Sequence, residues 1–142
     1  MFGYVDIDMT AGPTEIAVIA NQSANAEYVA RDLEAENEHH QGLAILITTS
    51  KALAKTIKSK VSRGYIVMAK SLDEAAEIAN AIAPEHLEIQ VRRPEALVRK
   101  IKNAGAIFTG PYSPASVGDY AAGPSHVLPT GGTARFFSGL GV

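Results

Sequence analysis

Glu85 and His86 stand side by side directly after Pro84, at the start of an apolar run. Imidazole is the usual general base near neutral pH, and burial can raise the pKa of a neighbouring carboxyl group into a useful range. The pair therefore predicts acid–base chemistry. A second interpretation stays open at this point, in which a backbone carbonyl holds the imidazole and the histidine has only a structural role.

Glu36 and His39 are three residues apart, near the end of an expected helix. This spacing places both side chains on one helix face, from which both can reach a single cation. Alternatively, His39 is favoured by the negative end of the helix dipole and Glu36 is simply solvated. Because the chain has no cysteine, any metal site depends on His, Asp, Glu or amide ligands.

Asp119 and His126 lie in a segment that glycine and proline residues bracket. We interpret it as a shaped loop, in which Asp119 suits a hard metal ion and His126 suits a contact with substrate or with a metal ligand. A loop without chemistry is the open alternative. The sequence contains no complete dinucleotide fingerprint, phosphate loop or serine nucleophile elbow. The candidates therefore favour metal-assisted or acid–base chemistry over covalent catalysis.

The elements that must position these residues follow a regular alternation of strand and helix. A short strand is expected at residues 4–8, and buried strands at 15–20, 43–49, 65–69, 87–91 and 105–109. Helices are expected at 24–39, 51–62, from the Ser71 cap to Ala83, and at 94–103. This order predicts an α/β fold, with an open, mostly parallel sheet and helices on both faces. Ligands of such sheets collect beyond the carboxyl ends of the strands.

Length and charge limit the classes of partner. The 142 residues favour a single domain, residues 1–142, with a glycine-rich loop region from about residue 110. A net charge of -2 without a block of like charge argues against a nucleic-acid partner. No apolar run approaches the roughly 20 residues that span a bilayer, and the first residues lack the pattern of a signal peptide. We therefore expect no membrane partner and a cytoplasmic location.

Five motifs give the chain a resemblance to the histidinol dehydrogenase family of zinc- and NAD-dependent enzymes. They occur in the family's order and span nearly the whole chain. The motifs are DMTAGPTE at residues 8–15, EAENEHH at 34–40, ITTS at 47–50, APEHLE at 83–88, and GDYAAGPSHVLPTGGTARF at 118–136. The resemblance implies an incomplete Rossmann-like half-domain and the oxidation of L-histidinol, through an aldehyde, to L-histidine with two NAD.

The resemblance also implies roles for single residues. His86 matches the base that takes the alcohol proton, and Glu85 matches the group that activates water for the second oxidation. His39 and Asp119 match zinc ligands, and Glu36 stands where the family has a glutamine ligand.

Substrate contacts follow from the same resemblance. Thr14 matches a residue that touches substrate, and His126 matches a histidine that lines the substrate pocket. Because the family's zinc orients the substrate, Glu36, His39 and Asp119 count with His86 as substrate-binding residues.

Family members are several times longer than this chain. The parts that they have in addition hold most of the NAD site and a further zinc-ligating histidine, which a partner subunit supplies in the family's homodimer. We therefore expect a histidinol dehydrogenase-like domain, also a homodimer, that is incomplete or inactive by itself. The alternative is a stand-alone, non-catalytic relative that binds a metal or an imidazole ligand, or only self-associates.

Overall fold

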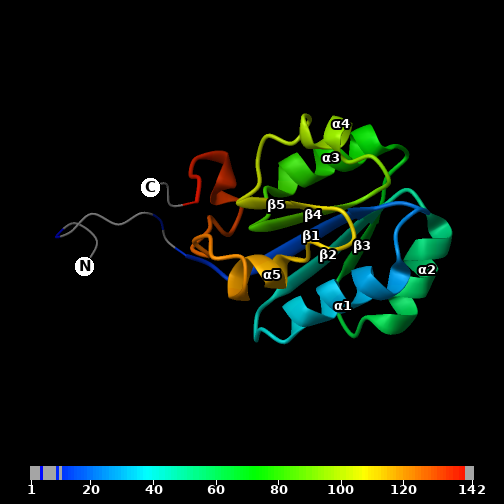
Figure 1. Cartoon of the computed structure of the whole chain (residues 1–142), viewed down its shortest axis with the longest axis horizontal. Helices are drawn as coiled ribbons and strands as arrows, with labels where there is room; N and C mark the ends of the chain where they lie inside the picture. The colour runs from blue at the N-terminus through cyan, green and yellow to red at the C-terminus, as the bar shows by residue number, and fades with distance from the viewer. Residues whose placement is uncertain (1–3, 5–8, 10, 140–142) are drawn as a thin grey trace.

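A five-stranded parallel sheet forms the centre of the protein. The structure, a computed structural model, describes residues 4, 9 and 11–139. The sheet order is β3-β2-β1-β4-β5 (Figure 1). The strands are β1 (Glu15–Ala20), β2 (Leu43–Thr48), β3 (Tyr65–Met68), β4 (His86–Gln90) and β5 (Ala106–Thr109). The parallel α/β sheet is confirmed, whereas the strand expected at residues 4–8 falls on a range of which only Tyr4 is described.

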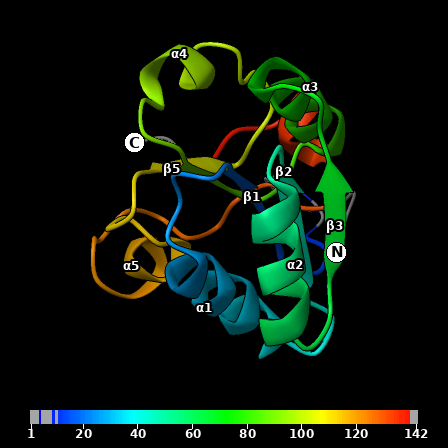
Figure 2. The same cartoon turned by 90° about the vertical axis from the view of Figure 1, so that its right-hand side faces the viewer.

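Helices cover both faces of the sheet, as the alternating pattern predicts. In Figure 2, α3 and α4 lie on one side, and α1, α2 and α5 lie on the other. The helices are α1 (Ala26–Asn37), α2 (Lys51–Lys60), α3 (Leu72–Ile82), α4 (Glu95–Val98) and α5 (Ala115–Tyr120), with a short 3₁₀ helix η1 (Thr133–Arg135). The loop region expected from residue 110 thus contains two short helices. None of the described helices is long and apolar enough to cross a membrane.

Strand β4 has two chemically different faces, although all five of its residues are buried. Successive side chains of a strand point to opposite faces of the sheet. Leu87 and Ile89 belong to the apolar core that packs against α3. His86, Glu88 and Gln90 therefore share the other face, toward α1 and α5. Burying these polar side chains lowers the stability of the fold unless they are paired. We therefore expect functional residues on this face of β4.

Helix α4 is much shorter than the helix predicted at residues 94–103. Asn80 of α3 holds the segment that follows α4 in a different conformation. Its side-chain amide donates to the carbonyl of Lys100 at 2.8 Å, and its oxygen accepts the amides of Lys102 at 2.6 Å and Asn103 at 3.1 Å. Because these bonds satisfy the backbone without helical hydrogen bonds, they replace the last turns of the expected helix.

Local signals fix the beginning and the end of α3, the helix that leads to Glu85 and His86. The Ser71 hydroxyl oxygen accepts the amide of Glu74 at 3.1 Å, and the Glu74 carboxylate accepts the amide of Lys70 at 2.5 Å. The helix ends at Ala83, which adopts the left-handed conformation with φ 54°. Pro84 follows and cannot continue a helix. The predicted cap at Ser71 is confirmed, and the chain enters β4 in a defined direction.

We predict that Ser71→Ala lowers the free energy of unfolding by about 1 kcal/mol, because an amide of the first turn of α3 loses its acceptor. Urea denaturation measures the change. Ser59→Ala is the matched control, since the exposed Ser59 hydroxyl only donates to the carbonyl of Thr56 near the end of α2. That variant should stay within about 0.5 kcal/mol of the wild type. Equal effects of the two substitutions would contradict a capping role for Ser71.

Candidate functional site

The candidate site residues gather at the amino ends of the strands. Thr14 directly precedes β1, Glu85 directly precedes β4, and His86 begins β4. Glu36 lies in the last turn of α1 and Asp119 near the end of α5, and both helices run back toward the same edge of the sheet (Figure 1). The expectation of a site beyond the carboxyl ends is therefore wrong for these residues. They come from the starts of strands and the ends of helices, which meet at the opposite edge.

His86 lies between two carboxyl groups. Its Nε2 is 3.5 Å from Oδ1 of Asp119, and its Nδ1 is 3.9 Å from Oε2 of Glu85. The imidazole is only 5% exposed, and within the described residues neither ring nitrogen has a hydrogen-bond partner. No described backbone carbonyl holds the ring, which removes the support for a purely structural role. Two free nitrogens beside carboxyl groups suit an acid–base group that awaits a ligand.

Glu85 connects the site to the glycine-rich loop. Its Oε2 accepts the amide of Glu15 at 3.2 Å, and Oε1 of Glu15 accepts the amide of Gly131 at 3.0 Å. Next to this contact, the amide of Gly12 donates to Oγ1 of Thr130 at 2.5 Å. Gly131 has φ 61°, a conformation that favours glycine. Residues 131–133 thus turn at this point, and the bond from Gly131 to Glu15 attaches the loop to the start of β1.

Glu36 is buried at the end of α1, with an exposed fraction of 7%. Burial raises the pKa of its carboxyl group, while the nearby side chains of Thr14, His86 and His39 oppose that rise. Its Oε1 is a buried acceptor without a partner among the described residues. A buried carboxylate oxygen of this kind suits a cation.

A cavity of about 290 Å³ joins the three candidate metal ligands. Glu36, His39 and Asp119 all line it, together with Asp32 and Glu88. Imidazole nitrogen and carboxylate oxygen are the donor types that zinc accepts, so the donor set fits the ion chemically. However, in the described part of the chain no three His, Asp or Glu side chains lie close enough together to hold a metal ion. These residues by themselves do not form a closed metal site.

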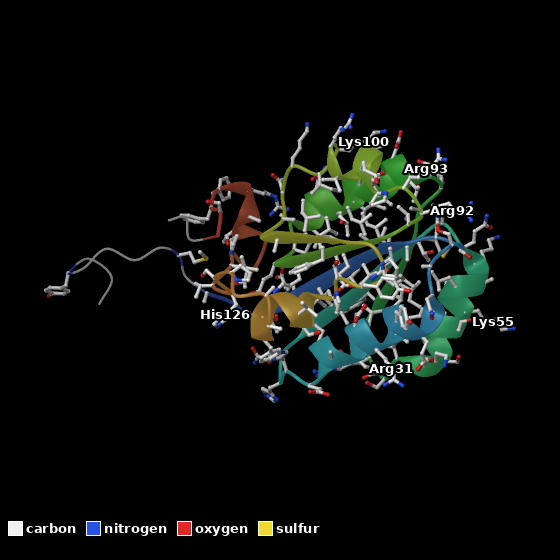
Figure 3. The ribbon with its side chains drawn as sticks, viewed as in Figure 1. Arg31, Lys55, Arg92, Arg93, Lys100 and His126 are labelled. Carbon is white, nitrogen blue, oxygen red and sulfur yellow. The ribbon has the colours of Figure 1, made fainter. Side chains whose placement is uncertain are left out.

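His126 is the candidate that the structure leaves apart. It is exposed in the loop after α5, and among the described residues no hydrogen bond or ion pair joins it to His86 or Asp119. Figure 3 shows His126 on the side of the molecule where β4 begins, opposite Arg92 and Arg93, which follow that strand. Its contact with a substrate stays a prediction.

Sequence reasoning missed Glu88 and Asp32. Glu88 is completely buried on the polar face of β4, where its Oε1 accepts the amide of Ala115 at 2.8 Å. Its carboxyl group is also hydrogen-bonded to Asp32 of α1, and burial together with the charge of Asp32 raises the pKa of Glu88 to about 8. A carboxylate inside a buried strand, two residues after His86, was the signal in the sequence that marked this position.

Comparison with known proteins decides the family. A family model described as histidinol dehydrogenase matches residues 1–142. The chain belongs to the histidinol dehydrogenase family. The histidinol dehydrogenase of Rhodopirellula baltica is 48% identical over 99% of this chain and 34% of its own length. That of Aquifex aeolicus is 47% identical over all of this chain and 38% of its own length.

A solved structure supports the same family. The crystal structure of histidinol dehydrogenase from Elizabethkingia anophelis matches 96% of this chain with a TM-score of 0.91 and 36% sequence identity. The match covers 36% of that protein's chain. The present chain thus spans about a third of the length of its histidinol dehydrogenase relatives. The parallel α/β fold is therefore the fold of one portion of these enzymes.

We predict that Glu88→Gln weakens the pH dependence of stability. Because the pKa of Glu88 is raised from 4.5 to about 8, the folded state holds a proton between these values that the unfolded state releases. Stability of the wild type therefore falls as the pH rises through this window, by about 1.4 kcal/mol per pH unit for one full proton. Glutamine cannot ionise, so the variant should lose this component.

Urea denaturation at several pH values between the two pKa values measures the effect. Glu77→Gln, on the exposed side of α3, is the matched control and should keep the wild-type pH dependence. An unchanged slope in Glu88→Gln would show that Glu88 is ionised in the folded protein.

Proposed function

We propose that this chain supplies the proton-transfer residues, and part of the zinc and substrate site, of an enzyme that oxidises L-histidinol to L-histidine. The observation that supports it most is the buried imidazole of His86, which lies between Glu85 and Asp119 with both nitrogens unpaired. Family membership supplies the reaction, and this geometry supplies a group able to move a proton.

His86 and Glu85 divide the proton transfers between the two oxidations. In the first, a nitrogen of His86 takes the hydroxyl proton of histidinol as the carbinol carbon loses a hydride and becomes an aldehyde. In the second, Glu85 takes a proton from the water that adds to this aldehyde, and loss of a second hydride gives the carboxylic acid. NAD, when bound, accepts each hydride.

Glu36, His39 and Asp119 are the residues of this chain that would hold zinc. Their shared cavity and the unpaired Oε1 of Glu36 support this assignment. Since they do not form a closed site, we propose that a further ligand comes from outside the described residues, from the partner subunit of a homodimer. Zinc would orient the substrate. Thr14 and His126 would contact the same substrate, and the Thr14 side chain lies near the Glu36 carboxyl group.

We predict that zinc and histidinol bind to the purified chain cooperatively. Isothermal titration calorimetry should show weak zinc binding that becomes stronger when histidinol is present, because the two would bind side by side and contact each other. His86→Ala should keep the zinc affinity, since His86 moves a proton and does not ligate the metal. Asp119→Asn should lower the zinc affinity about tenfold or more, because a charged ligand is lost.

The outcomes separate two functions. Independent binding of zinc and histidinol would favour a non-catalytic relative that binds a metal or an imidazole ligand without the reaction. A loss of zinc affinity in His86→Ala would make this histidine a ligand and contradict its assignment as the base.

We also predict that the 142-residue chain alone oxidises histidinol barely or not at all. The described residues form no closed metal site, and the chain covers about a third of the length of its relatives. Formation of NADH from NAD and histidinol, followed by absorbance in the presence of zinc, measures the rate. Sustained turnover by the purified chain would contradict the proposal that the site is completed elsewhere.

A further inference from the structure

One buried carboxyl group connects the two helices that face β4. Oε1 of Glu88 accepts the amide of Ala115, the first residue of α5, at 2.8 Å. The same carboxyl group is hydrogen-bonded to Asp32 of α1. Glu88 is 0% exposed, so these partners satisfy a carboxyl group that has little access to bulk water. Glu88 thus bonds to α1 and α5 at the same time.

Both contacts of Glu88 lie about one helical turn before a candidate site residue. Ala115 precedes Asp119 by four residues in α5, and Asp32 precedes Glu36 by four residues in α1. Glu88 also follows His86 by two residues in β4, so both side chains leave the same face of the sheet. Glu88 is therefore connected to the candidate site through α1, α5 and β4.

Helix α5 depends on this contact more than a long helix would. It contains six residues, and its N-cap residue, Pro114, provides no side-chain hydrogen bond. A helix of this length is not stable by its own backbone bonds. Yet α5 carries Asp119, whose Oδ1 lies 3.5 Å from Nε2 of His86. Holding the start of α5 is thus a condition for placing Asp119.

We propose that Glu88 is a positioning residue that holds α5 so that Asp119 lies against His86, with Asp32 completing the bridge to α1. The inference rests on the proposed function only in giving His86 the role of the base. Two carboxyl groups that are hydrogen-bonded to each other share one proton, which limits the charge buried between the helices. The raised pKa of Glu88, about 8, agrees with a proton retained there at neutral pH.

Labelling of histidine by diethyl pyrocarbonate tests the inference, because His86 is only 4% exposed and should react slowly in the wild type. Mass spectrometry gives its modification relative to the exposed His126 in the same sample. Glu88→Met removes the bonds to Ala115 and Asp32 and also the bond that Gln90 donates. We expect the labelling of His86 to rise about fivefold or more as α5 opens. Glu88→Gln keeps an acceptor for Ala115 and a donor for Asp32 and loses only the acceptor for Gln90, so it should react as the wild type does.

Ala115→Pro provides a second, independent variant. It replaces the amide that Glu88 accepts by a ring carbon that cannot donate and that crowds Oε1 of Glu88, and it keeps the carboxyl groups of both Glu88 and Asp32. Proline is tolerated at the first position of a helix, and Pro114 already has the extended conformation, with ψ 155°, that a residue before proline prefers. This variant should increase the labelling of His86 as Glu88→Met does, and it carries the test if Glu88→Met fails to fold.

Ile89→Ala is the control for a general loss of stability, since Ile89 packs in the core on the opposite face of β4. It should lower the unfolding midpoint and leave the labelling ratio of His86 to His126 unchanged. An equal rise of the ratio in Ile89→Ala, or unchanged protection of His86 in Ala115→Pro, would overturn the inference. These readouts need neither zinc nor turnover. A failure of the cooperative binding of zinc and histidinol would therefore contradict the proposed function and leave the positioning role standing.

Discussion

The burial of strand β4 is the constraint on which the site depends. All five of its residues are buried, yet His86, Glu88 and Gln90 put polar groups on one face. Polar groups removed from water must find partners or lose stability. Glu88 finds Ala115 and Asp32, and Gln90 donates to Glu88 at 3.3 Å. The packing of α1 and α5 against this face therefore depends on polar contacts as well as on apolar ones.

The polar atoms that find no partner collect at one edge of the sheet. Both nitrogens of His86, Oε1 of Glu36 and Oε2 of Glu15 are buried without a hydrogen bond within the described residues. Each such group costs about 1–3 kcal/mol, a cost that a ligand with matching groups would relieve. The carboxyl end of α1 adds the negative end of its dipole to these acidic groups. The acidic groups at the amino edge of the sheet thus suit a cation or a protonated ligand.

The fold offers a second edge that the candidate residues do not use. The strand order places a switch of crossover direction between β1 and β4, and ligands of parallel sheets usually bind beyond the carboxyl ends there. A cavity of about 490 Å³ does lie at that edge, lined by Asn25, Gln90 and Tyr112 among others. The histidine and carboxyl groups that are the candidate functional residues lie at the other edge. General rules of the fold thus predict a crevice correctly without locating this site.

Local patterns in the sequence by themselves determined the described strands to within about a residue, the cap at Ser71, and the place of Glu85 and His86 directly after the end of a helix at Pro84. These features depend on neighbours in the chain, which is why they could be predicted. Only the tertiary structure decided that Asp119 lies against His86 and that Glu88 joins α1 to α5. Such contacts depend on β4 pairing with β1 and β5, and on the directions in which helices return across the sheet. No local pattern records which distant side chains a buried polar face will meet.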